Sequence, residues 1–226
     1  MRVCAFSDMH GNLDFKVEPC DVVMICGDIV PLYIQRHLVD SEAWFRDVFI
    51  PWCNELPCER VVLVAGNHDF AFETVPGKMK GHLKGQDKIV YLDCETYEYD
   101  GHVIFGTPMC KIFGNWAFMY TQEEQKEKYD RYLSALGKVD ILMAHDAPYG
   151  TSDILLQENC PWADGEHIGN KALADFVSEL KPRLFIHGHL HSTNHELEKI
   201  GDTSVYNVSL LDENYKMAYK PLYINL

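Results

Sequence analysis

Short apolar runs bounded by Gly, Pro, Asn or Asp recur along the whole chain. Runs of this length, rich in Val, Ile and Phe, are typical of buried strands, because a helix that crosses a membrane needs roughly 20 apolar residues. The expected strands are Val3–Phe6, Val22–Cys26, Val61–Ala65, Ile89–Leu92, Tyr97–Tyr99, Val103–Phe105, Ile141–Ala144, Leu184–Ile186, Val205–Val208 and Leu222–Ile224.

Three longer segments between these runs place apolar residues on one helical face. They predict helices over Ser41–Leu56, Gln122–Leu136 and Asn170–Leu180. Pro51 should end or kink the first, since proline lacks the N–H that a helix interior requires. The alternation of strands and helices predicts an α/β protein with mixed sheets.

The sheet order has one further indication in the sequence. The expected strands Ile89–Leu92, Tyr97–Tyr99 and Val103–Phe105 follow one another closely, as antiparallel neighbours do. We expect a loop at Met79–Lys88, and we find no linker, repeat or low-complexity tract. The sequence therefore predicts a single domain over residues 1–226.

Composition excludes several classes of function. The 226 residues carry 34 acidic and 20 basic side chains, a net charge of −14, which disfavours long DNA or RNA as a partner. The run Arg2–Phe6 lacks the features of a signal peptide, so we expect a cytoplasmic protein without a membrane segment. The eight cysteines form no C-x-x-C pair, and we expect them to be free thiols.

Polar motifs stand where five of the apolar runs end. In open α/β sheets, ligands bind at the carboxyl ends of the strands. Together the motifs supply carboxylate, amide and imidazole groups in the mixture that a two-metal site uses, although each motif alone is a weak signal. The motifs are Asp8-Met9-His10, Gly27-Asp28, Gly66-Asn67-His68-Asp69, His145-Asp146 and Gly188-His189-Leu190-His191.

This order of motifs resembles that of the calcineurin-like metallophosphoesterases, D-x-H, G-D, G-N-H-D/E, H and G-H-x-H, from residue 8 to residue 191. The segments 61–69, 105–108 and 145–150, together with Trp116, are similar to the small class III members that include cyclic-nucleotide phosphodiesterase-like proteins. Some animal proteins of that branch carry Gly where this chain has His189. The resemblance implies a four-layer α/β/β/α sandwich of two mixed sheets with a dinuclear metal site.

The resemblance also implies a role for each motif residue. Asp8, His10 and His191 would hold one ion, Asn67, His145 and His189 the second, and Asp28 would bridge both. A hydroxide between the ions would attack phosphorus in line. His68 would stabilise or protonate the leaving oxygen, and Asp69 would hold the His68 ring.

The mixed ligands suit Mn²⁺, Fe²⁺, Ni²⁺, Co²⁺ or Zn²⁺, of which we expect Mn²⁺ to activate. The expected substrate is a small-molecule phosphoester, contacted by Asn67 and His68. Phe70, Trp116 and Tyr149 are candidates for stacking a nucleobase above the metals, although aromatic residues more often belong to the core.

Several activities remain open at this level. We prefer a phosphodiesterase acting on small-molecule or cyclic-nucleotide-like diesters. The alternative is a phosphomonoesterase acting on a phosphoprotein or a small metabolite, because both reactions use the same ligands. A non-catalytic metal-binding interaction module is a further alternative. Such a module should have lost Asn67, His68 or a metal ligand, and this sequence keeps all of them. A nuclease should show a basic groove, which this sequence lacks.

Overall fold

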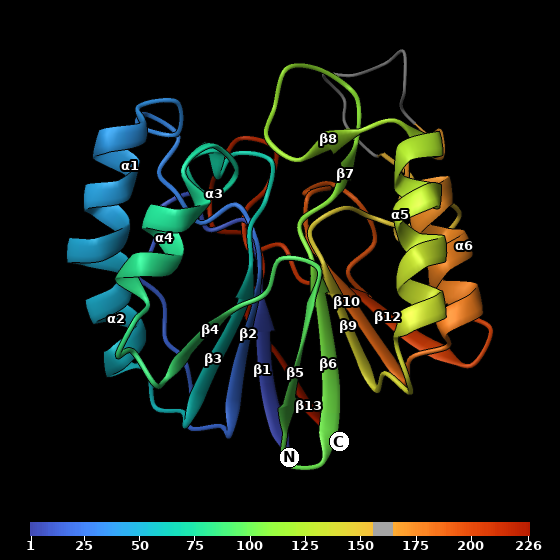
Figure 1. Ribbon diagram of the computed structural model, residues 1–226, viewed down its shortest axis with the longest axis horizontal. Helices are drawn as coiled ribbons and strands as arrows, with labels where there is room; N and C mark the ends of the chain where they lie inside the picture. The colour runs from blue at the N-terminus through green and yellow to red at the C-terminus, as the bar shows by residue number, and fades with distance from the viewer. Residues whose placement is uncertain (156–164) are drawn as a thin grey trace.

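The computed structural model describes residues 1–155 and 165–226. Two β-sheets face each other, and helices cover the outer face of each (Figure 1). Helices α1 to α4 lie against one sheet, and α5 and α6 lie against the other. The expected four-layer α/β/β/α sandwich of two mixed sheets is therefore confirmed.

The first sheet has the strand order β13-β1-β2-β3-β4. Strands β1 to β4 run parallel, and β13 pairs antiparallel with β1. Alternate side chains of such a strand point to opposite faces, and both faces of this sheet are buried, so β2 is apolar throughout. The strands are β1 (Arg2–Phe6), β2 (Val22–Cys26), β3 (Arg60–Val64), β4 (Ile89–Tyr91) and β13 (Leu222–Asn225).

The second sheet has the order β11-β12-β10-β9-β6-β5. Its four central strands are parallel, and the two edge strands are antiparallel. A short ribbon of β7 (Cys110–Lys111) and β8 (Met119–Tyr120) lies apart from both sheets. The six strands are β5 (Glu95–Tyr99), β6 (His102–Thr107), β9 (Ile141–Ala144), β10 (Leu184–His187), β11 (Glu198–Ile200) and β12 (Thr203–Asn207).

One expectation about strand pairing is wrong. Only β5 and β6 form the expected antiparallel pair, because β4 pairs parallel with β3 in the other sheet. The chain thus crosses from one sheet to the other between Tyr91 and Glu95. Closeness along the sequence could not distinguish a turn within a sheet from a crossing between two sheets.

The helices are α1 (Leu38–Trp44), the π-helical turn η1 (Phe45–Phe49), α2 (Ile50–Glu55), α3 (Phe70–Thr74), α4 (Pro76–His82), α5 (Gln122–Ala135) and α6 (Lys171–Leu180). The helical segment does not end at Pro51 but continues to Glu55. The π-helical turn comes directly before α2, and Pro51 takes a first-turn position of α2, where its missing N–H costs little. The segment Met79–Lys88, expected to be a loop, begins inside α4.

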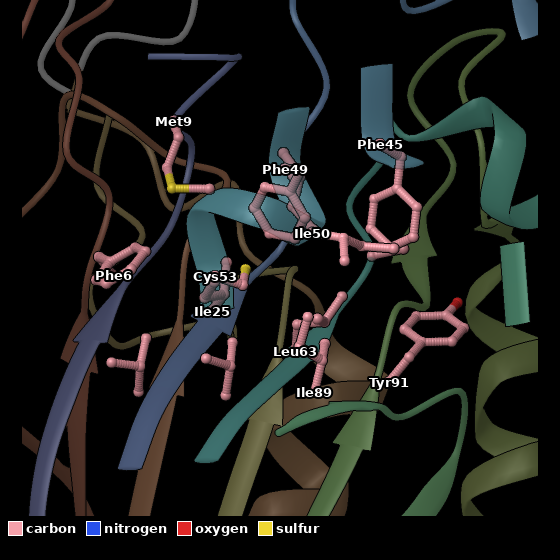
Figure 2. Packing of buried hydrophobic residues seen from close by; sticks show 14 of the residues in the cluster. Phe6, Met9, Ile25, Phe45, Phe49, Ile50, Cys53, Leu63, Ile89 and Tyr91 are labelled. Atoms are coloured by element: carbon pink, nitrogen blue, oxygen red, sulfur yellow. The ribbon is translucent and has the colours of Figure 1, made fainter. Parts of the chain in front are cut away.

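Three apolar cores separate the layers. Helices α1 to α4 pack on the first sheet through a core that includes Phe45 and Phe49, as Figure 2 shows. The middle core joins the sheets and includes Val64 of the first sheet and Ile104 and Ile186 of the second. This packing sets the strand ends of the two sheets beside each other.

Two further features of the described residues bear on function. None of their helices is both long enough and apolar enough to cross a membrane. Seven cysteines are free thiols, as expected, and the eighth, Cys160, lies outside the described residues.

Candidate metal centre

The predicted ligands follow the carboxyl ends of five strands and lie at the end of the sandwich away from the chain termini (Figure 1). Three of these strands belong to the first sheet and two to the second. The site is therefore complete only when the two sheets pack. Asp8 and His10 follow β1, Asp28 follows β2, Asn67 follows β3, His145 follows β9, and His189 and His191 follow β10.

Four of these residues have a left-handed backbone although none is glycine. Their φ angles are 56° for Asp8, 44° for His10, 52° for Asp28 and 72° for His189. This region is unfavourable for residues with a side chain, and such strain collects at functional sites. The surrounding packing therefore holds these side chains in directions that a relaxed strand end would not give them.

Two glycines allow the strand ends to approach this closely. A Cβ atom at Gly66 would overlap the Asp28 carboxylate and lie 2.7 Å from Cε1 of His145. A Cβ atom at Gly188 would overlap the Asp8 carboxylate and lie 2.6 Å from Cβ of Ser7. Glycine at these positions is thus needed for the spacing of the site.

The first ligand group consists of Asp8, His10 and His191, whose candidate ligand atoms lie within 4.8 Å of one another. Nε2 of His191 is 3.4 Å from Oδ1 of Asp8, and its Nδ1–H donates to the Asp212 carbonyl at 2.9 Å. That hydrogen bond leaves Nε2 as the ring nitrogen that faces the site. The Ser209 hydroxyl donates to Oδ2 of Asp8 at 2.7 Å and orients this carboxylate.

Asp28 lies at the centre of the site and is 2% exposed. Its Oδ2 is 3.4 Å from Nε2 of His145, 3.6 Å from Nε2 of His10 and 3.8 Å from Nε2 of His68. Asp28 shares one group of possible ligands with His10 and His68, and another with Asp8 and His145. A carboxylate shared by two groups is what a bridging ligand requires.

These distances fit metal coordination better than hydrogen bonding. Ligand bonds of 2.0–2.2 Å place neighbouring donor atoms about 3.0–3.6 Å apart. The separations around Asp28 approach that range, and two of the three exceed a hydrogen bond. Both ring nitrogens of His10 are buried without a partner, which buried polar groups rarely are. The residues therefore fit a bound cation.

The protonation states of the metal-free site follow from burial and from the charges of its carboxylates and histidines. Burial by itself raises the pKa of Asp28, but the charges of His145 and His68 hold that pKa well below its ordinary value. Burial lowers the pKa of His145, but the Asp28 charge raises it to about 10, so His145 carries a proton. Burial lowers the pKa of His10 to about 4 and that of His189 to about 3, so both are neutral, as metal ligands must be.

The second predicted group is more loosely assembled. Oδ1 of Asn67 lies 2.9 Å from Nε2 of His145. The His189 ring lies 5.1 Å from the His145 ring, centroid to centroid, and its backbone N–H donates to the Asp8 carboxylate at 3.0 Å. His189 is in none of the tight ligand groups, so its role as a ligand of the second ion stays a prediction.

His68 is held at the edge of the site by several contacts. Its backbone N–H donates to Oδ1 of Asp28 at 2.8 Å, and the Nδ1–H of its ring donates to Oε1 of Gln35. The ring centroids of His68 and Trp116 are 4.4 Å apart. These contacts turn Nε2 of His68 toward Asp28.

The expectation that Asp69 holds the His68 ring is wrong. The Asp69 carboxylate accepts hydrogen bonds from the backbone N–H groups of Ile29 and Val30, both at 3.0 Å, and of Gly66, at 2.7 Å. Asp69 thus ties the loop after β2 to the loop after β3. Burial and the Asp28 charge raise its pKa to about 7.

A cavity of about 350 Å³ opens above the ligands. Trp116 lines it, and its role in stacking a base stays a prediction. Phe70 packs instead on Arg36, whose Cζ is 4.4 Å from the ring centroid, and Tyr149 packs on Lys171, whose Nζ is 4.7 Å away. Phe70 and Tyr149 are thus outside this lining, which corrects the expectation of a stacking role. The lining residues are Asp28, Asn67, His68, Phe113, Trp116, Leu155, His189, Leu190, His191, Glu213 and Tyr215.

Sequence reasoning missed several residues of the site. Ser209 could have been found, because it follows an apolar run as the other motif residues do. Gln35, Glu213 and Tyr215 lie in loops with no motif, and nothing in the local sequence indicates their place. Tyr215 has φ 57°, and its ring stands edge-on to the His10 ring with centroids 5.0 Å apart.

Comparison with known proteins agrees with this geometry. A family model described as calcineurin-like phosphoesterase matches residues 1–193. Metallophosphoesterase domain-containing protein 1 of Homo sapiens is 24% identical over an alignment that covers 100% of this chain and 71% of that protein. UPF0046 protein C25E10.12 of Caenorhabditis elegans is 26% identical, with 76% of this chain and 63% of that protein covered. A second UPF0046 protein of that nematode has 56% of its length covered, so the chain spans less than two thirds of both nematode relatives.

Solved structures share the fold at low sequence identity. TT1561 of Thermus thermophilus superposes with a TM-score of 0.59 at 13% identity, covering 99% of this chain and 98% of that one. Phosphopantetheinyl hydrolase of Mycobacterium tuberculosis superposes with a TM-score of 0.54 at 14% identity, covering 94% and 90%. At these identities the likeness shows the fold alone.

Proposed function

Because the chain belongs to the calcineurin-like phosphoesterase family, we propose that it is a metal-dependent hydrolase of small-molecule phosphodiesters. The observation that carries this proposal is the convergence of two buried carboxylates and four imidazoles, of which Asp28, His68 and His191 line one cavity. These groups come from loops after strands of both sheets.

The proposed ligand sets follow the geometry of the site. Asp8, His10 and His191 hold one ion, and Asp28 lies between the two positions. Asn67, His145 and His189 complete the second position. Two divalent ions, of which we propose Mn²⁺ as the activator, supply a nucleophile at neutral pH and stabilise negative charge on the phosphoryl oxygens.

The residues of the chain orient the ester and handle its proton. His68 faces Asp28 through Nε2 and is placed to give a proton to the leaving oxygen. We propose that Asn67 and His68 contact the phosphoryl group, and that Trp116 packs against the ester substituent. Asp69 supports the reaction only by fixing the loops that carry these residues.

The charge of the cavity supports a diester rather than a monoester. Among the described residues that line it, none is Lys or Arg, and Glu213 adds a carboxylate. A diester carries one negative charge, whereas a monoester carries up to two at neutral pH. The lining gives the second charge no basic side chain to pair with, which favours the diester.

The test compares two chromogenic esters on one preparation. Protein stripped of metal by a chelator is resupplied with Mn²⁺, and in parallel with Fe²⁺, Co²⁺, Ni²⁺ or Zn²⁺. Hydrolysis of bis(p-nitrophenyl) phosphate and of p-nitrophenyl phosphate is then measured, with the Asn67→Ala protein as the blank.

The outcomes separate the candidate functions. Metal-dependent hydrolysis that is faster for the diester is the expected result. Faster hydrolysis of the monoester would overturn the diester preference and favour a phosphatase of phosphoproteins or small metabolites. No turnover above the blank with any of these metals would argue for a non-catalytic metal-binding module.

A further inference from the structure

The His68 ring is fixed by groups from loops that are distant in the sequence. The Gln35 side chain bonds its Nδ1, the Trp116 ring lies 4.4 Å away at 31°, and the His10 ring meets it edge-on at 4.8 Å and 81°. The tilted Trp116 ring restricts tipping of the imidazole. Among the described residues, Gln35 supplies the hydrogen bond that distinguishes Nδ1 from Nε2.

The loop that carries Gln35 is itself anchored beside Trp116. The neighbouring Arg36 lies over the Phe70 ring at 4.4 Å and over the Trp116 ring at 4.8 Å, measured from its Cζ. Its Nη2 donates to the Asn115 carbonyl at 2.7 Å. Arg36 therefore joins the loop before α1 to the loop between β7 and β8, and it places the Gln35 amide against His68.

Asp69, the carboxylate next to His68 in the sequence, does not accept a hydrogen bond from the His68 ring. Asp69 receives backbone N–H groups of Ile29, Val30 and Gly66. Asp28 accepts the His68 backbone N–H, and its Oδ2 lies 3.8 Å from the ring's Nε2. Gln35 is therefore the side chain that the described structure assigns to Nδ1.

We propose that Gln35 is a positioning residue, which selects the ring nitrogen that His68 presents to the substrate. This inference rests on the proposed phosphodiester hydrolysis. When the ring is protonated, Nδ1–H donates to Gln35 and Nε2–H points into the cavity. As the ester P–O bond breaks, its electron pair goes to the leaving oxygen, which takes the Nε2 proton.

The path of the proton explains why an uncharged amide suits Nδ1 of His68. After the transfer, His68 is left as the neutral Nδ1–H tautomer, which is the form that an amide oxygen accepting from Nδ1 stabilises. Water supplies the hydroxyl group that bonds phosphorus and the proton that restores the ring. Gln35 has no charge, so it orients the ring without adding a third carboxylate beside Asp8 and Asp28.

The test uses the metal-loaded protein and two diesters that differ in their leaving group. Proton donation matters little for p-nitrophenolate and much for a more basic oxygen. We therefore expect Gln35→Leu to lower kcat about 10-fold to 100-fold on diphenyl phosphate and less than about 3-fold on bis(p-nitrophenyl) phosphate. KM and bound metal should stay as in the unaltered protein.

Two further variants test whether Gln35 acts through His68. Gln35→Glu keeps an acceptor for Nδ1, and we expect it to restore most of the lost rate on diphenyl phosphate. Gln35→Leu combined with His68→Ala should be no slower than His68→Ala alone. Gln86→Leu is the matched control, because Gln86 is equally half-buried but pairs with Asn54 at a distance from the site.

Three results would overturn the inference. These are an equal loss on both diesters, independent losses in the double variant, or a ring tautomer that does not depend on Gln35. The last is read from ¹⁵N shifts of His68, where we expect the Nδ1–H tautomer in the unaltered protein and its loss in Gln35→Leu. This readout needs no turnover, so it separates a failure of this inference from a failure of the proposed activity.

Discussion

The ionisation of single side chains gives the metal-free protein a pH dependence that can be derived group by group. Burial lowers the pKa of His191, but its bond to Asp8 raises it above the ordinary 6.5 to about 8. The pKa of His145 is raised further, to about 10. In the unfolded chain both rings lose their proton near pH 6.5.

The sign of the effect follows from these values. A folded pKa above the unfolded one stabilises the protein fully below pH 6.5, and this stabilisation is lost as the pH rises. Between pH 6.5 and 8 we expect the free energy of unfolding of the metal-free protein to fall, by about 1 kcal/mol for His191 alone. Urea unfolding at both pH values measures it, and His191→Gln should flatten the curve. A free energy that increased over this interval would contradict the assignment.

Glycine at position 66 is a second feature of residue scale. Gly66→Ala would place a methyl group against the Asp28 carboxylate and the His145 ring, so we expect metal affinity to fall at least about 10-fold. Gly77→Ala is the matched control, because a Cβ there, in the exposed part of α4, meets nothing within 4 Å. Isothermal titration with Mn²⁺ compares the two. Equal affinities would show that the strand ends can separate without cost.

At the scale of elements, α5 and α6 begin with caps of different kinds. The Thr121 hydroxyl accepts from the Glu124 N–H at 3.2 Å, in an exposed capping box. Oδ1 of Asn170 accepts from the Leu173 N–H at 3.1 Å, while its buried amide group donates to Gln125 at 2.6 Å and to Asp146 at 2.8 Å. Asn170 therefore also joins α6 to α5 and to the loop after β9.

This difference predicts unequal costs of removing the caps. Thr121→Ala should destabilise the protein by about 1 kcal/mol, the usual value of an exposed cap. Asn170→Ala should cost about 2–4 kcal/mol, because it also removes the donor to the buried Gln125 oxygen and one of the two donors to Oδ2 of Asp146. Denaturant midpoints of the two variants test the order. A cost at Asn170 no greater than that at Thr121 would contradict a structural role for the buried network.

At the scale of the whole molecule, the site and the packing of the sheets depend on each other. Ligands follow β1, β2 and β3 of one sheet and β9 and β10 of the other. The sheets also meet directly beside the site, where the Ser7 N–H donates to the Val208 carbonyl at 2.8 Å. A cation bound to both sheets should therefore oppose their separation.

Metal removal tests this coupling. A ligand at 100 times its Kd stabilises the folded state by about 2.7 kcal/mol. We expect a chelator to lower the Tm of the protein by several degrees and Mn²⁺ to restore it. The Asp28→Asn variant should show a much smaller difference between the two conditions. An unchanged Tm in the unaltered protein would mean that no ion bridges the sheets.

Much of this organisation could be predicted from local patterns. The predicted strands and the helices at Gln122–Leu136 and Asn170–Leu180 were confirmed. A face that packs in a core gives apolar residues a regular spacing along the sequence. Helices α3 and α4 were missed, since both are too short to show that spacing. The crossing of the chain between β4 and β5 was also missed, because strand partners are chosen by packing between layers.

The sequence by itself determined the identity of the chemical groups and the edge of the sheets at which they stand, since motif order and strand ends are local properties. Only the tertiary structure decided which groups meet. In the folded protein Asp69 accepts backbone N–H groups, and Gln35 accepts from the His68 ring. Phe70 and Tyr149 pack on basic side chains outside the cavity lining. The physical reason is that the partner of a side chain is set by which loops the packed sheets bring within hydrogen-bond distance, and neighbours along the chain do not reveal that distance.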